Sequence, residues 1–173
     1  MPDATELALI TASLPAALTF VFQRVERLLS SRGTDPEATV AVPPELTGTL
    51  QLPLQPDEAR LQACRDQLET LRDALADYAH GDVPVTATPG LLRTWARLRD
   101  ALEDIYGQRL TFDGEHRPAS GPFVHQKADH LTGKATGMEA DDIRGNARVV
   151  QDMGTVGPDA EMTGMKGKRI GPA

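Results

Sequence analysis

The segment Lys134-Ala-Thr-Gly-Met-Glu-Ala-Asp-Asp-Ile143 aligns without a gap on Glu161-Met-Thr-Gly-Met-Lys-Gly-Lys-Arg-Ile170, 27 positions further along the chain. Four positions hold the same residue in both copies: Thr136 and Thr163, Gly137 and Gly164, Met138 and Met165, and Ile143 and Ile170. Four others hold charges of inverted sign: Lys134 and Glu161, Glu139 and Lys166, Asp141 and Lys168, and Asp142 and Arg169. The chain therefore contains one unit twice, and the charges of the two copies are complementary.

This repeat predicts stacked β-strands. Parallel strands about 4.8 Å apart place each residue over its copy, where like charges repel and opposite charges attract. Met138 and Ile143 are five positions apart, so a single strand would send them to opposite faces, and a bend between them returns both to one interior. The pattern predicts a short two-repeat β-arc tail, similar to a β-solenoid, with Met138, Ile143, Met165 and Ile170 inside.

A looser repetition precedes each copy. Val124-His-Gln126 and Val150-Gln151 are similar at a spacing of about 25 positions, so each repeat is roughly 25 to 27 residues long. Ala147, Val149, Gln151 and Met153 fall at every second position, which is the spacing of one face of a strand. Stacked Gln126 and Gln151 would add a ladder of amide hydrogen bonds.

Two repeats are too few to bury a core, because stacked-repeat folds need about three units or more. The charge alternation lets the second repeat of one chain lie against the first repeat of another, so we expect a homopolymer. Two alternatives stay open: a monomeric appendage folded against the helices, and a disordered tail. The predicted oligomerisation residues are Gln126, Lys134, Thr136, Gly137, Met138, Glu139, Asp141, Asp142, Ile143, Gln151, Glu161, Thr163, Gly164, Met165, Lys166, Lys168, Arg169 and Ile170.

Charge divides the chain in the same place. The net charge of −7 belongs entirely to residues 1–122, which contain 18 acidic residues, 11 Arg and no Lys, whereas residues 123–173 are neutral. An acidic body argues against nucleic acid as a partner. The single cysteine, Cys64, excludes a disulfide framework and favours a reducing cytoplasm. Asp3 and Glu6 stand where a signal peptide would carry positive charge, so we expect no signal peptide.

Three helices are predicted in the acidic part. A capping box at Asp3-x-x-Glu6 begins the first, which runs to Gly33; the second begins at Pro56 and ends at Gly81; the third follows Thr88-Pro89 and ends at Gly107. Residues 36–55 fit either a β-hairpin or an extended strap across the helices. The expected fold class is mainly α, an antiparallel bundle of three or four helices in residues 1–117, a Gly/Pro linker in 118–123 and the repeat tail in 124–173.

The first helix carries no charge between Glu6 and Arg24. One interpretation is a central helix buried by its neighbours. The other is a helix that enters a bilayer when released, and because Pro15 bends it, an oblique or interfacial insertion is easier to defend than a straight span. The candidate membrane residues are Leu14, Leu18, Phe20, Val21 and Phe22.

Catalysis and metal binding find little support. His125 and His130 lie near Asp129, but no third ligand has a suitable spacing, and there is no phosphate-binding loop or nucleophile motif. We expect no catalytic residues, no metal and no cofactor.

The apolar first helix, the Gly/Pro linker and the charge-complementary repeats together resemble the bacterial amyloid-signalling effectors with a Bell-type, HeLo-like helical domain. The tail is similar to the HET-s prion-forming region in having two repeats with complementary charges. The ratio of 14 Arg to 4 Lys also resembles small proteins of actinobacterial NTPase conflict systems. The resemblance implies a non-enzymatic cell-death or immunity effector whose tail assembles by templated β-solenoid stacking and whose helical domain acts on the membrane.

The same resemblance implies particular partners and a location. The partners would be further copies of the chain, an NTPase sensor with a matching motif, and membrane lipids. The location would be the cytoplasm, with movement to the inner face of the plasma membrane on activation. The alternative is an adaptor that docks a larger conflict-system partner without membrane activity.

Overall fold

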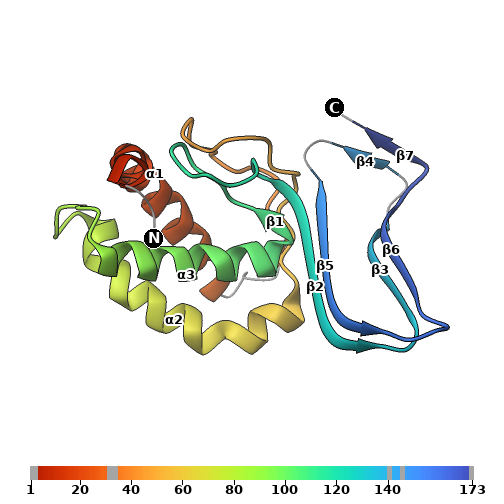
Figure 1. Ribbon diagram of the computed structural model, residues 1–173. Coiled ribbons are helices and arrows are strands. Elements are labelled where there is room, and N and C mark those ends of the chain that lie inside the picture. Colours follow the sequence, from red (N-terminus) through yellow and green to blue (C-terminus); the bar gives the residue numbers. More distant parts are fainter. Residues whose placement is uncertain (1–3, 31–34, 140–141, 145–146, 172–173) are drawn as a thin grey trace. The chain divides into compact units, whose positions relative to one another are not determined.

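The computed structural model describes residues 4–30, 35–139, 142–144 and 147–171 (Figure 1). The chain divides into two compact units, Met1–Ser120 and Gly121–Ala173, which we call the helical unit and the repeat unit. The helices are α1 (Ala4–Leu29), α2 (Glu58–His80) and α3 (Pro89–Tyr106). The strands are β1 (Gln108–Arg109), β2 (Gly121–Leu131), β3 (Lys134–Glu139), β4 (Asp142–Arg144), β5 (Arg148–Val156), β6 (Glu161–Lys166) and β7 (Arg169–Gly171).

Local signals set the ends of α2 and α3. The carboxylate of Asp57 accepts a hydrogen bond from the backbone N–H of Arg60 at 3.0 Å, which caps the start of α2. Gly81 ends this helix with a φ of +83°. Glycine adopts this left-handed conformation with little strain because it has no Cβ atom. The hydroxyl of Thr88 caps α3 in the same way as Asp57 caps α2, and Gly107 ends it. Both helices lie within two residues of their predicted bounds.

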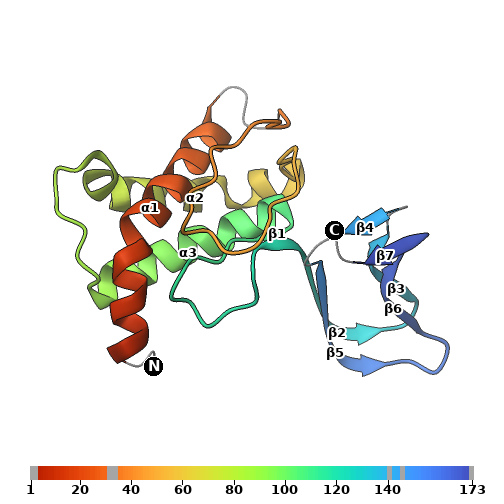
Figure 2. The same ribbon diagram turned by 90° about the horizontal axis from the view of Figure 1, so that it is seen from above.

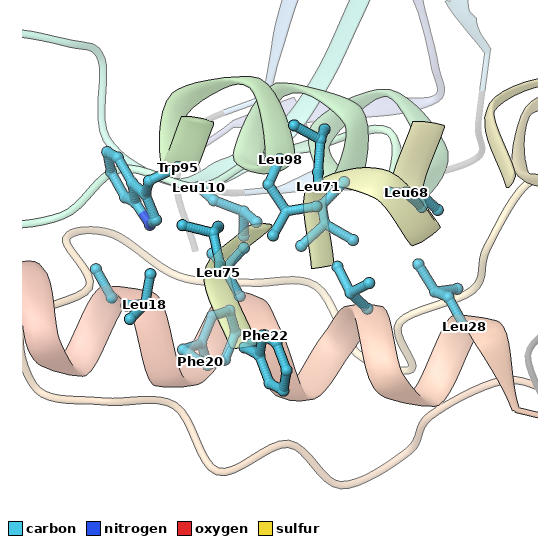
Figure 3. Close-up of a cluster of buried hydrophobic side chains, with 14 of the residues drawn as sticks. Leu18, Phe20, Phe22, Leu28, Leu68, Leu71, Leu75, Trp95, Leu98 and Leu110 are labelled. Carbon is cyan, nitrogen blue, oxygen red and sulfur yellow. The ribbon is translucent and has the colours of Figure 1, made fainter. Parts of the chain in front are cut away.

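The core of the helical unit lies where α1 crosses α2 and α3 (Figure 2). Leu14, Val21, Val25 and Leu28 form the inner face of α1 and are all at most 1% exposed. Leucines from α2 and α3 pack on them, together with Trp95 (Figure 3). Burial of these apolar side chains supplies most of the unit's stability.

Residues 35–55 form an extended strap, one of the two predicted alternatives. Glu37 and Leu54 exchange backbone hydrogen bonds of 2.8 and 2.9 Å, which holds the two ends of the strap together. Leu50 and Leu54 are buried in the core. The guanidinium of Arg24 on α1 donates to the carboxylate of Glu37 at 2.5 Å, which fixes the strap to that helix.

The predicted fold class is wrong. Of the described residues 42% are helical and 25% are in strands, so the chain is an α/β protein and not a helical bundle with a short β-solenoid-like tail. Two physical reasons account for the difference. α1 crosses α2 and α3 instead of running alongside them, and irregular segments complete the core. The eleven-residue β2 and nine-residue β5 extend well beyond the few residues in which the sequence shows a repeat.

Residues 118–123 do not form a separate linker. The backbone carbonyl of Pro118 accepts a hydrogen bond from the hydroxyl of Thr111 at 2.7 Å, and the Ser120 hydroxyl accepts one from the Thr111 N–H at 2.8 Å. Ser120 is fully buried. The boundary between the units falls between Ser120 and Gly121, where β2 begins, because these hydrogen bonds tie the residues before it to the helical unit.

Candidate functional site

The two repeats pair strand by strand along the repeat unit (Figure 1). β2 pairs with β5, β3 with β6 and β4 with β7, and all three pairs are parallel. In the first pair Val124 lies beside Val149, an offset of 25 positions, and in the second Lys134 lies beside Glu161, an offset of 27. The second repeat gains the two additional residues in the turn at 157–160. The predicted spacings of 25 and 27 are therefore confirmed.

The register places two of the predicted charge pairs in contact. The Nζ atom of Lys134 lies 2.6 Å from a carboxylate oxygen of Glu161, and that of Lys166 lies 2.9 Å from a carboxylate oxygen of Glu139. The hydrogen bond that Lys166 donates to the carboxylate of Glu139 is the largest cause that raises the pKa of Lys166 above its usual 10.5. All four side chains are more than half exposed, so each pair adds little free energy and its main effect is to select the register.

The other predicted positions are placed as follows. Thr136 lies beside Thr163 and Met138 beside Met165, and both methionines are half-buried. The backbones of Ile143 and Ile170 are paired, as are those of Asp142 and Arg169, while the side chains of these four residues lie outside the described part. Asp141 lies outside the described residues, and Lys168 is exposed.

Gln126 and Gln151 occupy paired backbone positions, as predicted. The side-chain amide of Gln151 donates to the backbone carbonyl of Thr163 at 3.2 Å, which joins β5 to β6 within the second repeat. The side chain of Gln126 lies outside the described residues. The predicted amide ladder therefore stays a prediction, and the observed bond of Gln151 instead links two strands of one repeat.

No large side chain whose burial the structure describes in the repeat unit is buried. Its described hydrophobic side chains are all partly or fully exposed, with those of Ala128, Leu131, Ile143 and Ile170 outside the described part, whereas the helical unit holds a continuous core. Val156 and Met162 are 48% and 47% exposed. The sheets β3–β6 and β4–β7 have two strands each in the described structure, so every one of these strands has an edge that faces no further strand. Such edges are templates for pairing with another chain.

The sequence does not reveal that Val149 packs closely over Gly137 inside the repeat unit. A Cβ atom added to Gly137 would lie 2.1 Å from Cγ1 of Val149 and 2.6 Å from the carbonyl oxygen of Gly164. Val149 thus occupies space that only a glycine leaves open. The available signal was a glycine within a predicted strand, which often marks a close approach of another backbone or side chain.

The candidate membrane residues of α1 are all buried. Leu14, Leu18, Phe20, Val21 and Phe22 are between 0% and 7% exposed and face the core of the helical unit. In the described part of the chain, no helix combines the length and the apolar character needed to cross a bilayer. The exposed face of α1 is a narrow stripe that contains Ala12, Pro15, Thr19, Gln23 and Glu26.

Other kinds of site find no support in the described residues. No group of three or more His, Cys, Asp and Glu side chains there converges as metal ligands would. The side chain of His125 lies outside the described part, and His130 and Asp129 are exposed. The open strand edges of the repeat unit are therefore the best candidate functional site. No protein-family model, curated protein or solved structure matches the chain.

Proposed function

We propose that the chain is a non-enzymatic, self-assembling signalling protein. In this proposal the repeat unit adds to further copies of itself by parallel strand pairing, and the growing assembly concentrates the helical units. One observation carries the proposal: two repeats pair in register with matched charges, yet no hydrophobic side chain described in the repeat unit is buried. A pair of strands whose apolar side chains are exposed is stabilised when neighbouring strands cover them.

The charge pattern supports this mode of assembly. Glu161 lies against Lys134 within one chain, and a second copy stacked on the second repeat would place its own Lys134 on the other side of Glu161. Glu139 and Lys166 alternate in the same way. Opposite charges would then meet at every step of the stack, while the backbone hydrogen bonds and the covering of Met162 and Val156 would supply the stability.

For the helical unit we propose a cell-death or immunity effector that acts on the inner face of the plasma membrane. The uncharged stretch of α1 would act there after release from the core. In the resting state the apolar residues of α1 would stay buried, as they are in this structure. The ion pair of Arg24 with Glu37 would hold the strap in place until release. A sensor NTPase with a matching motif would start assembly in the cytoplasm. The alternative is an adaptor that assembles in the same way without membrane activity.

Removal of the repeat unit tests the self-assembly proposal. The full chain is expected to form filaments with a strand spacing of about 4.8 Å in fibre diffraction. A chain that stops after Ser120 is expected to stay monomeric and helical, because it keeps the whole described core. A full chain that stays monomeric in sedimentation at high concentration, at both low and high salt, would contradict the proposal.

A further inference from the structure

Gly137 and Gly164 occupy equivalent positions in the two repeats but have different surroundings. They lie between the paired positions Thr136–Thr163 and Met138–Met165. An added Cβ at Gly137 would collide with Val149 and with the backbone of Gly164, whereas one at Gly164 would meet nothing within 4 Å. The space beside the glycine is thus occupied at Gly137 in the first repeat and empty at Gly164 in the second repeat.

The repeat itself says what would fill the open position. One step along the stack carries Val124 to Val149, which lie beside each other in the β2–β5 pair, and carries Gly137 to Gly164. Gly137 of the first repeat receives Val149 of the second. The position that follows Val149 along the stack therefore belongs to the next copy of the chain, and the equivalent residue there is Val124. That copy's Val124 would occupy the space above Gly164.

We propose that Gly164 is the position that receives Val124 of a second copy of this chain, so that copies join head to tail with a defined polarity. This inference rests on the proposed function and specifies its interface. The charges agree with it, because a first repeat on a second repeat places Lys134 against Glu161 and Glu139 against Lys166. Stacking of identical repeats would instead set Lys134 on Lys134 and Glu139 on Glu139.

Substitution of one glycine in the full chain tests this interface. Neither Gly164 nor Gly133 has a positive φ, and an added Cβ meets nothing within 4 Å at either position, so alanine fits both in the single chain. Gly164→Ala is expected to slow filament growth roughly tenfold or more, because its methyl group takes the space of the incoming valine. Gly133→Ala adds the same methyl group in a turn and is expected to grow at the wild-type rate.

The outcomes separate this inference from the proposed function. Wild-type chains that never form filaments would contradict both. Wild-type and Gly164→Ala chains that grow equally fast would overturn the head-to-tail interface and leave self-assembly standing. Slow growth of Gly164→Ala beside normal growth of Gly133→Ala would support the interface.

A mixing experiment tests the polarity and shows whether the variant is folded. A Gly164→Ala copy keeps its first repeat, so it can add to the exposed second repeat of a wild-type filament but then offers a blocked surface to the next copy. Growth of labelled wild-type seeds, followed by two-colour microscopy, is expected to stop at one end when a small fraction of the variant is present. Continued growth at both ends, or arrest of both ends, would overturn the proposal.

Discussion

The helical unit and the repeat unit use the same kinds of residue in opposite ways. The helical unit buries its apolar side chains and also several of its ion pairs, such as Arg99 with Glu115, whose side chains are 9% and 6% exposed. The repeat unit leaves its ion pairs in solvent and buries none of its described hydrophobic side chains. The helical unit is therefore complete within one chain, whereas the repeat unit has the register of a stack without its neighbours. Loss of a contact should affect folding in the first unit and association in the second.

The largest expected effect follows removal of Arg99, one of two buried arginines in the described helical unit. Arg99 pairs with Glu115 and lies over the ring of Trp95 at 4.7 Å. Arg99→Met would leave the buried Glu115 carboxylate without its cation, at a cost of about 3–5 kcal/mol in the free energy of unfolding. Arg60→Met removes an exposed pair with Asp104 and is expected to cost less than about 1 kcal/mol. Urea denaturation of the chain that stops after Ser120 measures both, and equal losses would contradict the contrast.

A second effect appears at alkaline pH. Burial is the main cause that raises the pKa of Tyr106 from 10.0 to about 12. The unfolded chain therefore releases this proton first, and the tyrosine's contribution is complete below pH 10 and lost as the pH rises toward 12. The helical unit should lose roughly 3 kcal/mol over this interval from this one group. Tyr106→Phe should show a smaller loss in urea denaturation across the same pH range, and an unchanged pH dependence would contradict the assignment.

The charge pairs between the two repeats, Lys134 with Glu161 and Glu139 with Lys166, are expected to control association and not folding. Glu139→Lys places two cations together at every step and is expected to prevent or strongly slow filament growth, with no change in the unfolding of the helical unit. Adding Lys166→Glu restores opposite signs and the wild-type net charge, so growth should recover. Asp159→Lys shifts the net charge equally from an exposed turn and serves as the control. A double variant that grows no faster than Glu139→Lys would contradict the stacking register.

The membrane proposal can be tested with a substitution on the exposed face of α1, which should disturb the folded structure least. Thr19 is exposed on α1 in the resting unit, and its hydroxyl donates to the carbonyl of Pro15. Thr19→Asp should leave the helical circular dichroism signal unchanged but abolish leakage from liposomes, because it charges the middle of the uncharged stretch. Thr70→Asp, at an exposed site on α2 with the same local hydrogen bond, is the matched control. Undiminished leakage with Thr19→Asp would favour the adaptor alternative.

The features that could be predicted from the sequence depend on residues close together in the chain or on the similarity between the two copies of the repeat. Asp57, Gly81, Thr88 and Gly107 mark helix ends because capping is local. The repeat register could be predicted because a wrong alignment of the two copies places like charges together. Both kinds of signal are visible without knowledge of the tertiary structure.

The features that could not be predicted depend on contacts between distant segments. Arg99 reaches Glu115 beyond the end of α3, and Ser120 bonds back to Thr111, so no short pattern reveals either contact. The fold class was wrong for the same reason, because the strap completes the helical core and the strands extend beyond the visible repeat. Gly164 looks identical to Gly137 in sequence, and only the structure shows that one is covered and the other open.

Electron cryomicroscopy of filaments of the 173-residue chain would test head-to-tail stacking through the axial rise per chain. Alternation of first and second repeats gives each chain two layers, so the rise should be about 9.5 Å, twice the strand spacing. Lys134 of each copy should then lie between Glu161 of its own chain and Glu161 of the neighbour. A rise of about 4.8 Å, with every repeat stacked on its own copies, would contradict the account.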